Sequence, residues 1–362
     1  MKEKHRSFLI INPFGIGDVL FSTPFIRNIK ESFSSAKIFY LCNKRTCPIL
    51  ENHPLVDKTF IYERDEFEAI KKVSNYQWIK KLWGFISEIK KENIDVAIDL
   101  SLNTQFGFFS WLAGIKTRIG YNYKNRGFFL TKKIKFSGYN DKHVADYYLG
   151  LLEFIGIEPR HKKIELFLKE EHRERANALC RKYAINDNDS LIVIAPCGGA
   201  SWGAESFRKH WAKDKFAELA DKLIEKFKVK IIFAGNRNER NIIEEIERLM
   251  RHVSIKVIDL PLGDFLALLN KAKIIVANDG GPLHMGLALG IKTVSIFGPV
   301  DERVYGPYSE EKSKHIVIKK DLSCRPCYRG FRLAQCHLER KCLNEITVDD
   351  VFSAVESLLR QN

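Results

Sequence analysis

The sequence has no apolar run long enough to cross a bilayer, and no secretory signal peptide precedes its first apolar segment. We therefore expect a protein that does not span the membrane and stays in the cytoplasm. Hydrophobic residues make up 45% and charged residues 29% of the chain, which is the balance of a globular protein. Its 362 residues exceed one ordinary domain and predict two, each large enough for its own hydrophobic core.

Motifs for binding nucleic acid are also absent. The chain has no helix-turn-helix pattern, no aromatic RNA-binding signature and no zinc-finger spacing, so we expect no nucleic-acid partner. It nevertheless has a net charge of +14, with basic residues dense at Lys132-Lys133-Ile134-Lys135 and at His161-Lys162-Lys163. Two interpretations of this surplus remain open: a surface that contacts anionic membrane lipids, and a solvated surface without a partner.

The eight cysteines fall into two groups. Four lie in apolar, strand-like surroundings and are expected to be packed thiols: Cys42, Cys47, Cys180 and Cys197. The other four form a cluster near the C-terminus: Cys324, Cys327, Cys336 and Cys342. The first pair has zinc-site spacing, but the second pair encloses five residues, which is wider than most structural zinc sites use. Because disulfides are rare in the cytoplasm, we favour free thiols over a structural metal.

Apolar β-branched runs alternate with helical patterns along both halves of the chain. Strands are predicted at Ser7–Asn12, Lys37–Cys42, Lys58–Tyr62 and Asp95–Leu100, and then at Ser190–Pro196, Val229–Ala234, Ile255–Leu260, Ile274–Ala277 and Thr293–Phe297. Helices are predicted between them, at Leu20–Ser32, Tyr76–Glu92, Thr104–Ala113 and Lys215–Phe227. This alternation predicts βαβ units, and hence an α/β protein with two doubly wound, Rossmann-like parallel sheets.

The helical pattern Val144–Ile155 and the charged stretch Glu158–Lys163 separate the two series of strands. We therefore place the boundary near residue 160, which gives domains 1–160 and 161–362. The C-terminal helix is expected to pack back on the first domain. Doubly wound domains bind ligands at the carboxyl ends of their strands, so two such domains facing each other would share a central cleft.

The segment most informative about function is Asn278-Asp279-Gly280-Gly281-Pro282-Leu283-His284-Met285-Gly286-Leu287-Ala288-Leu289-Gly290. Apolar runs on both sides predict a strand, a tight turn, a short helix and another strand. Gly281 suits the N-cap of that helix and Pro282 its first residue, where a missing N–H costs nothing. Free amides beside two glycines favour a phosphate, whereas Asp279 would repel one and is better suited to sugar hydroxyls. Together these features predict a nucleotide sugar.

The first predicted strand leads into Gly15-Ile16-Gly17-Asp18, which lacks two parts of a dinucleotide-binding fingerprint. Position 20 is Leu20 instead of a third glycine, and the second strand ends in Leu41-Cys42-Asn43 without an acid for a ribose. An NAD-dependent oxidoreductase is therefore disfavoured. The turn instead delivers Asp18 to a strand-to-helix junction, where it either acts on a ligand or caps the helix. The residues alone do not separate these roles.

The second predicted domain opens with a loop of small residues that could hold a diphosphate. Its segment Gly198-Gly199-Ala200-Ser201 offers amides and a hydroxyl, and Lys209 is the favoured cation, with Arg208 as the competitor. The alternative is a plain surface loop, against which two nearby tryptophans argue. Glu239, in the glycine turn after the next strand, either accepts ribose hydroxyls or serves as an ordinary first-turn glutamate.

Taken together, these segments resemble the bacterial lipopolysaccharide heptosyltransferases of glycosyltransferase family nine. The matching segments are Gly17-Asp18-Val19-Leu20 with Thr23-Pro24, Arg118-Ile119-Gly120-Tyr121, Ala200-Ser201-Trp202-Gly203, Lys209-His210-Trp211, Asp279 to Gly290, Phe297-Gly298-Pro299 through Asp301, and the Cys324–Cys327 pair. The similarity covers nearly the whole chain. It implies a GT-B fold, inversion at the anomeric carbon, no metal or other cofactor, and a nucleotide-sugar donor, usually ADP-heptose. Gly15 and Gly280 depart from the residues common in the family, so a hexose or another heptose stays open as the donor sugar.

The resemblance also implies roles for single residues. Asp18 becomes the candidate general base, and Gly17 and Arg118 become candidate acceptor contacts, with a structural arginine at a strand start as the alternative for Arg118. The predicted donor-binding residues are Ser201, Lys209, Glu239, Asp279, Gly280, Gly281, Pro282 and Leu283. The expected acceptor is a lipid-linked saccharide of the lipopolysaccharide core, at the inner face of the cytoplasmic membrane. A nucleotide-sugar epimerase on the same fold and a non-catalytic nucleotide-sugar-binding protein are the alternatives.

Overall fold

The computed structural model describes residues 7–186 and 188–361. The chain divides into two compact units, one formed by Met1–Tyr139 with Val144–Lys163, and the other by Ile164–Asn362 with Asn140–His143. The two units divide between Lys163 and Ile164, and the short segment 140–143 belongs to the second unit. No helix among the described residues has the length and apolarity that a bilayer crossing requires.

The first unit is built on a six-stranded sheet with the order β3-β2-β1-β4-β5-β6. Neighbouring strands are parallel throughout. The strands are β1 (Ser7–Ile11), β2 (Lys37–Cys42), β3 (Lys58–Ile61), β4 (Val96–Asp99), β5 (Thr117–Tyr123) and β6 (Lys132–Phe136). All residues of β1 are buried, as expected for a central strand covered by helices on both faces.

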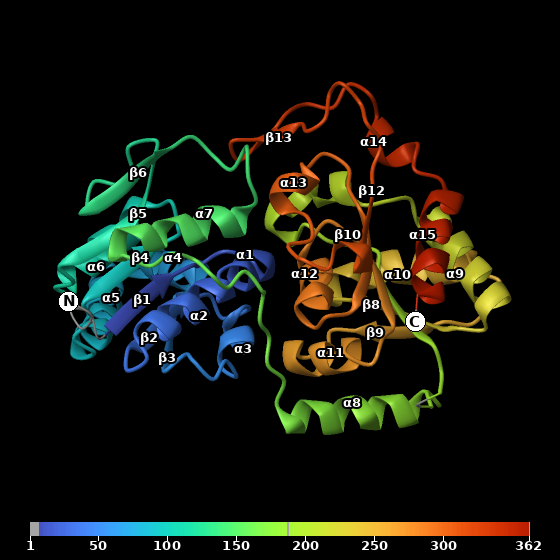
Figure 1. The fold of residues 1–362 in the computed structure, drawn as a ribbon, viewed down its shortest axis with the longest axis horizontal. Helices are drawn as coiled ribbons and strands as arrows, with labels where there is room; N and C mark the ends of the chain where they lie inside the picture. The colour runs from blue at the N-terminus through green and yellow to red at the C-terminus, as the bar shows by residue number, and fades with distance from the viewer. Residues whose placement is uncertain (1–6, 187, 362) are drawn as a thin grey trace. The chain divides into compact units, whose positions relative to one another are not determined.

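Helices cover both faces of this sheet (Figure 1). One face carries α1 (Ile16–Phe21), α2 (Thr23–Ser32) and α7 (Val144–Gly150), which contact one another, and α7 continues into the 3-10 helix η1 (Leu151–Ile155). The other face carries α4 (Arg64–Val73), α5 (Asn75–Lys91) and α6 (Thr104–Leu112), whose apolar side chains pack on Leu9 and Ile11 of β1. The short helix α3 (Cys47–Leu50) follows β2. Strand order reverses between β1 and β4, which is where doubly wound sheets bind ligands.

The second unit repeats this architecture with the strand order β12-β11-β10-β7-β8-β9. Its strands are β7 (Leu191–Ala195), β8 (Lys230–Gly235), β9 (Ile255–Ile258), β10 (Ile274–Asn278), β11 (Lys292–Ile296) and β12 (His315–Ile318). The longer helices are α8 (Glu170–Lys182), η2 (Ala200–Lys209), α9 (Lys213–Phe227), α10 (Arg240–Leu249), α11 (Leu262–Leu269), α12 (Gly281–Ala288) and α15 (Val348–Arg360). Short elements complete it: η3 (Arg237–Glu239), α13 (Glu302–Tyr305), η4 (Lys312–Lys314), the hairpin β13 (Tyr328–Arg329) and β14 (Arg332–Leu333), and α14 (Lys341–Asn344).

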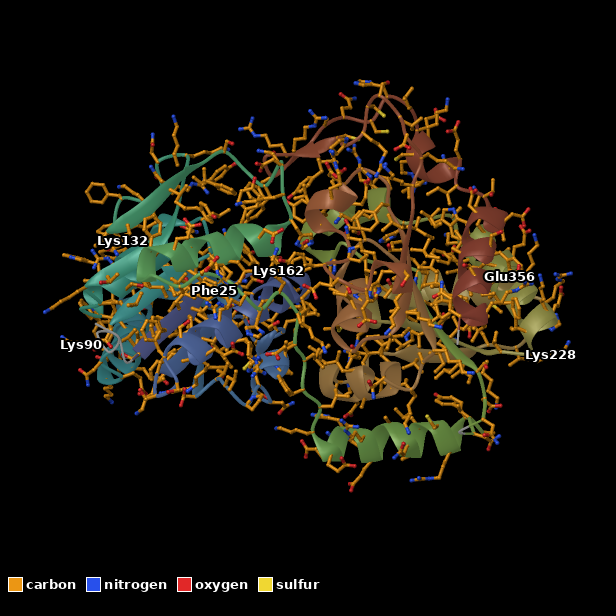
Figure 2. The ribbon with its side chains drawn as sticks, viewed as in Figure 1. Phe25, Lys90, Lys132, Lys162, Lys228 and Glu356 are labelled. Carbon is orange, nitrogen blue, oxygen red and sulfur yellow. The ribbon has the colours of Figure 1, made fainter. Side chains whose placement is uncertain are left out.

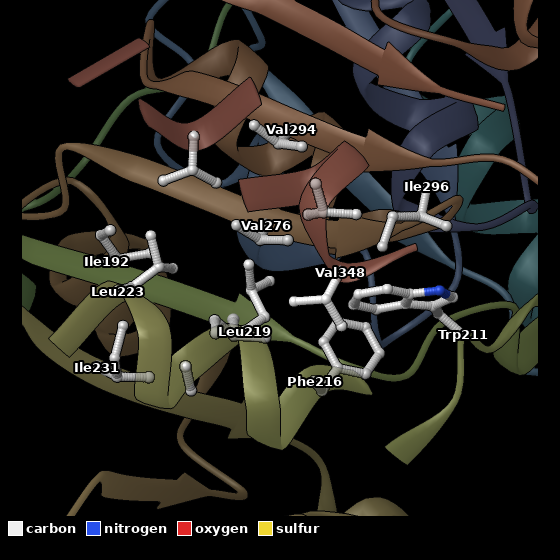
Figure 3. Close-up of a cluster of buried hydrophobic side chains, with 14 of the residues drawn as sticks. Ile192, Trp211, Phe216, Leu219, Leu223, Ile231, Val276, Val294, Ile296 and Val348 are labelled. Carbon is white, nitrogen blue, oxygen red and sulfur yellow. The ribbon is translucent and has the colours of Figure 1, made fainter. Parts of the chain in front are cut away.

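The core of the second unit lies between this sheet and the helices α9 and α15. Figure 3 shows the labelled side chains Ile192, Ile231, Val276, Val294 and Ile296 of the strands facing Leu219, Leu223 and Phe216 of α9, with Trp211 and Val348 beside them. The indole N–H of Trp211 donates to the carbonyl of Ile346 at 3.0 Å. Helix α15, which we expected on the first domain, therefore packs within the second unit, because its apolar face completes this core.

Candidate active site

Asp18 is the third residue of α1, directly after the carboxyl end of β1. Its Oδ2 accepts a hydrogen bond from the N–H of the N-cap residue Gly15 at 3.3 Å, and its Oδ1 accepts one from the Tyr148 hydroxyl at 3.4 Å. The amide of Asn12 donates to the Asp18 backbone carbonyl at 3.0 Å. The carboxylate therefore does cap its helix, yet it stays half-buried and also receives a donor from a distant helix.

The tyrosine that contacts Asp18 is fully buried in the first unit. Burial raises the pKa of the Tyr148 hydroxyl well above its ordinary value, and the nearby charge of Asp18 adds to the shift. The phenol therefore stays protonated and donates to the carboxylate. Donors of this kind stabilise the ionised form of Asp18, which is the form that a general base needs. Gly17, one residue earlier in α1, is half-buried.

In the second unit, Lys209 and Asp279 form an ion pair. Lys209 Nζ donates to Asp279 Oδ2 at 2.5 Å, and only 10% and 6% of the two side chains are exposed. The ammonium also lies 4.3 Å from the centroid of the Trp202 ring. The sequence predicted separate contacts for these two residues, one with phosphate and one with hydroxyls. In the structure the cation neutralises the carboxylate, so a diphosphate can approach Asp279 without net repulsion.

The loops that carry this pair touch through their backbones. A Cβ at Gly280 would lie 3.2 Å from Gly198 Cα and 3.2 Å from Gly199 N, so a side chain there would press on the facing backbone, although the φ of Gly280 is extended. Asn278 links the same loops, because its Nδ2 donates to the Pro196 carbonyl at 2.5 Å. Small residues therefore serve to bring two strand ends together beside the ion pair.

The helix of the Asp279 segment starts one residue earlier than predicted. Gly280 is the N-cap of α12, Gly281 its first residue and Pro282 its second, because Gly280 already has extended backbone and needs no side-chain cap. Gly280, Gly281 and Pro282 are half-buried, whereas the side chain of Leu283 is fully buried. A ligand at this turn can therefore meet backbone amides but not the Leu283 side chain.

The remaining predicted donor residues are Ser201 and Glu239. Ser201 is exposed in the first turn of η2. Glu239 forms a capping box, in which its Oε2 accepts the Asn236 N–H at 2.8 Å, and burial raises the pKa of its carboxyl. Its charge also helps to raise the pKa of the Cys197 thiol, which places Glu239 near the loop that follows β7.

Comparison with known proteins decides the family. A family model described as glycosyltransferase family 9 (heptosyltransferase) matches residues 82–337, more than half of the chain. The chain belongs to this family. The transferase is 24% identical over 355 residues to lipooligosaccharide heptosyltransferase 2 of Campylobacter jejuni, and the match covers 97% of each chain.

Solved structures show the fold of the transferase. A glycosyl transferase family 9 protein from Veillonella parvula aligns with a TM-score of 0.84 at 22% identity, covering 100% of this chain and 99% of that one. The heptosyltransferase WaaC of Escherichia coli, solved with ADP, aligns with a TM-score of 0.73 at 16% identity, covering 97% and 99%. The predicted GT-B class, with two Rossmann-like domains, is confirmed.

Arg118 of the transferase is engaged with its own unit. Its Nε donates to the Phe129 carbonyl at 2.6 Å, and its Nη1 donates to the carbonyls of Ile115 and, at 3.3 Å, Lys116. Since the last two residues precede β5, the guanidinium points to the amino-terminal edge of the parallel sheet. Asp18 follows a carboxyl end, at the opposite edge. These contacts favour the structural alternative for Arg118 over an acceptor contact.

Two features of the site went unpredicted. The ring of Tyr328, in β13, packs on Trp202 with centroids 4.9 Å apart, and nothing in the sequence links these positions. His284, inside the Asp279 segment, is buried, and burial with the charges of His143 and Lys209 lowers its pKa to about 3. A neutral imidazole therefore lies near the Lys209 ammonium. The position of His284 within the Asp279 segment indicated that it lies near the site, but its burial could not be inferred from the sequence.

The C-terminal cysteines of the transferase differ in exposure. Cys324 is exposed and Cys342 buried, whereas Cys327 and Cys336 are intermediate. A cavity of about 660 Å³ is lined by Cys324, Cys327, Cys336 and His337, among others. The Arg340 N–H donates to Cys336 Sγ at 3.3 Å and lowers the pKa of that thiol. In residues 7–186 and 188–361, no three Cys, His, Asp or Glu side chains are arranged to hold a metal. The other four cysteines are buried.

Proposed function

We propose that the chain transfers a heptose from ADP-heptose to a saccharide of the lipopolysaccharide core, with inversion at the anomeric carbon. The observation that carries the proposal is the buried Lys209–Asp279 pair beside two glycine turns, because it combines a cation and hydroxyl acceptors at amide-rich strand ends. Family membership and the names of its relatives, several of them lipopolysaccharide heptosyltransferases, support the same donor and acceptor. The ADP named with the solved WaaC structure supports the base.

In this proposal the donor lies along the turns of the second unit. The diphosphate accepts hydrogen bonds from Lys209 Nζ, from the Ser201 hydroxyl and from the amides at the start of α12. Lys209 has three N–H donors, so it can serve the diphosphate while one of them stays on Asp279. Asp279 then offers its other oxygen to a sugar hydroxyl, and Glu239 accepts ribose hydroxyls.

The first unit supplies the base. Asp18 takes the proton from an acceptor hydroxyl while that oxygen bonds to the anomeric carbon, and the bond from this carbon to the diphosphate oxygen breaks in the same step. The charge that develops on the departing ADP is stabilised by Lys209 and the amides of α12. Because the attack displaces the diphosphate directly, the configuration inverts. The acceptor, a lipid-linked saccharide, would bring the enzyme to the inner face of the membrane.

The test compares two aspartates that occupy the same helix position. Asp18→Asn and Asp350→Asn both keep an acceptor at the third residue of a helix, where each aspartate accepts the N–H of its N-cap residue: Gly15 at 3.3 Å for Asp18, and Thr347 at 2.8 Å for Asp350 in α15. We expect Asp18→Asn to slow heptose transfer to heptose-deficient lipopolysaccharide by roughly 10² or more, with ADP affinity little changed. The Asp350→Asn variant should transfer at the normal rate.

Equal rates of heptose transfer by the two variants would show that Asp18 only caps its helix and is not the general base. Two further measurements separate the alternatives. In a thermal-shift comparison, ADP should stabilise the protein more than UDP or GDP. Incubation with ADP-heptose alone should leave the sugar unchanged, because conversion without an acceptor would indicate an epimerase.

A further inference from the structure

One stretch of the first unit has no acidic residue. Residues 100–139 contain neither Asp nor Glu but hold seven basic side chains, at Lys116, Arg118, Lys124, Arg126, Lys132, Lys133 and Lys135. The stretch comprises α6, β5, the connecting segment 124–131 and the edge strand β6. Within the described residues, the exposed lysines of β6 therefore have no acidic neighbours in their own segment. Figure 2 labels Lys132, the first residue of β6.

The same stretch exposes aromatic side chains. Phe128 is 77% exposed and Trp111 51% exposed, although rings of this size are usually buried. Phe129 joins them, because its ring centroid lies 5.1 Å from that of Phe128 and 5.8 Å from that of Trp111. Phe108, on the same helix as Trp111, lies 5.1 Å from Phe129. The four rings form a cluster that joins α6 to segment 124–131, because Phe108 also lies 5.9 Å from Trp111.

Segment 124–131 is held by defined contacts. Arg118 donates through Nε to the Phe129 carbonyl at 2.6 Å, and the Thr131 N–H donates to the Arg118 carbonyl at 2.8 Å. The Gly127 N–H donates to Asn122 Oδ1 at 2.9 Å. These bonds fix the backbone on both sides of Phe128, so its exposure is a property of an ordered segment. The Arg118 side chain therefore has a structural role, because it holds segment 124–131 in place.

Basic side chains flank the aromatic cluster. Side chains alternate along β6, and Phe136 packs on Tyr121 and Tyr147 of the α7 side. Lys133 and Lys135 therefore project from the opposite face, where Lys133 Nζ donates to the Gly127 carbonyl at 3.2 Å. Arg126 is exposed in the segment itself, two residues before Phe128, and its guanidinium lies 5.8 Å from the centroid of the Tyr123 ring. We call Trp111, Arg126, Phe128, Phe129, Lys133 and Lys135 the basic aromatic surface.

We propose that the basic aromatic surface binds the interface of an anionic lipid bilayer. Aromatic rings lie favourably at the headgroup level, and lysines and arginines are attracted to anionic headgroups within a Debye length. Protection of the edge strand explains lysines on β6, because charged side chains discourage edge-to-edge pairing. It does not explain exposed rings at Phe128 and Trp111. The proposal concerns lipid binding alone and does not depend on the transfer reaction.

The test uses the full chain and vesicles without saccharide. Wild-type protein should co-sediment with vesicles of equal parts phosphatidylcholine and phosphatidylglycerol, but not with phosphatidylcholine alone, and high salt should weaken the binding. Phe128→Ser should reduce binding to the mixed vesicles roughly tenfold by removing the most exposed ring. The double variant Arg126→Glu, Lys135→Glu should reduce it at least as much.

Two variants of the second unit are the matched controls. Leu249→Ser removes an apolar side chain that is 55% exposed, and Lys271→Glu with Lys312→Glu makes the same change in net charge at exposed lysines. Both should bind the mixed vesicles like wild type. ADP affinity, measured on every variant, should be unchanged, which shows that each is folded.

Three results would overturn the proposal. One is wild-type protein that fails to bind the mixed vesicles. Another is equal binding of the mixed vesicles by the surface variants and the control variants, which would show that vesicle binding depends on net charge alone. The third is a dimer or a nucleic-acid complex that depends on Phe128 while vesicle binding does not, because the surface would then serve that partner. None of these results alters the comparison of Asp18→Asn with Asp350→Asn, so the two proposals fail separately.

Discussion

At the scale of single residues, the Lys209–Asp279 pair decides how the donor site works. Two buried charges cost desolvation energy, and their attraction only approximately offsets it, so the pair is poorly explained as a device for stability. It is better explained by ligand binding, because it keeps a cation ready beside glycine turns without leaving it unpaired. Arg208, the competing cation, instead contacts Glu205 at 2.8 Å and the Ala334 carbonyl at 3.0 Å.

Removing the cation and removing the pair should have different effects. Lys209→Ala leaves Asp279 buried and unpaired, so we expect a loss of about 3–5 kcal/mol in unfolding free energy together with weaker ADP binding. The double variant Lys209→Ala, Asp279→Ala should recover much of the stability but not the affinity. Urea unfolding and calorimetry with ADP measure the two quantities. Arg208→Ala is the control. If Lys209→Ala binds ADP with unchanged affinity, another cation must bind the phosphates.

Asp99 should make the first unit depend on pH. It ends β4, beside the end of β1, and burial raises its pKa from 3.8 to about 6 although its Oδ1 accepts the Ser101 N–H at 2.8 Å. The folded form therefore keeps a proton that the unfolded form releases, so the stability from this residue is lost as the pH rises from 3.8 to about 6. Asp99→Asn should gain up to about 3 kcal/mol relative to wild type over that range.

Hydrogen exchange of the β1 and β4 amides, followed at several pH values, reports the stability of this unit directly. Asparagine keeps the acceptor for Ser101 and cannot ionise, so the difference between variant and wild type isolates the carboxyl. A difference that does not change with pH would show that Asp99 ionises with an ordinary pKa in the folded protein.

At the scale of elements, the turn that opens η2 connects backbone conformation to the ion pair. Gly199 is the N-cap, with a left-handed φ of 71°, and a Cβ there would lie 2.8 Å from Lys209 Cδ. Gly156 has a similar φ of 74°, but a Cβ there would point into open space. Gly199→Ala and Gly156→Ala should each lose about 1–2 kcal/mol from backbone strain. Only Gly199→Ala should also weaken ADP binding, because it displaces the lysine.

Calorimetry with ADP separates these two effects. Equal ADP affinities in the two alanine variants would mean that Lys209 adjusts to the added methyl group and that the turn does not position it. A selective loss in Gly199→Ala would show that glycine is needed for the placement of the cation as well as for its φ.

Prediction from sequence succeeded for elements with continuous apolar runs and failed for the others. Nine strands were predicted close to their observed bounds, such as β2 at Lys37–Cys42. The strands β5, β6 and β12 of the two large sheets were missed, as were the two-residue strands β13 and β14. Strand β6 has three lysines in five residues and lies at a sheet edge. Because much of an edge strand faces solvent, its sequence lacks the continuous apolar run by which the other strands were predicted. The single helix predicted at Leu20–Ser32 is divided at Ser22 into α1 and α2.

For the site, the sequence indicated which residues matter but not how they pair. Asp18, Lys209 and Asp279 each follow a strand end or a small-residue loop, which is a local pattern. The contact of Lys209 with Asp279 joins residues 70 positions apart, and the packing of Tyr328 on Trp202 joins different loops, so neither leaves a local signal. For Arg118 the local pattern was misleading. Its segment resembles the family and suggested a ligand contact, but its guanidinium donates to backbone carbonyls.

At the scale of the whole molecule, the chemistry of the charged groups argues against a catalytic metal. Mg²⁺ and Mn²⁺ prefer several oxygen ligands, usually carboxylates close together. At the best donor motif the one carboxylate is Asp279, whose charge is already met by Lys209, and its sequence neighbours are Asn278 and Gly280. The diphosphate charge is therefore expected to be met by the ammonium and by amides at two helix starts.

We accordingly expect heptose transfer to continue in EDTA after dialysis against the chelator. The reason is electrostatic: Lys209 and the amide groups supply in fixed positions the positive potential that a divalent ion supplies elsewhere. Transfer rates with and without EDTA, with circular dichroism as the control for folding, check the expectation. A rate that falls in EDTA and returns with Mg²⁺ or Mn²⁺, while the fold stays intact, would contradict it. A loss of folding in EDTA that Mg²⁺ does not reverse would instead indicate a structural ion at the C-terminal cysteines, because thiolates favour softer metals.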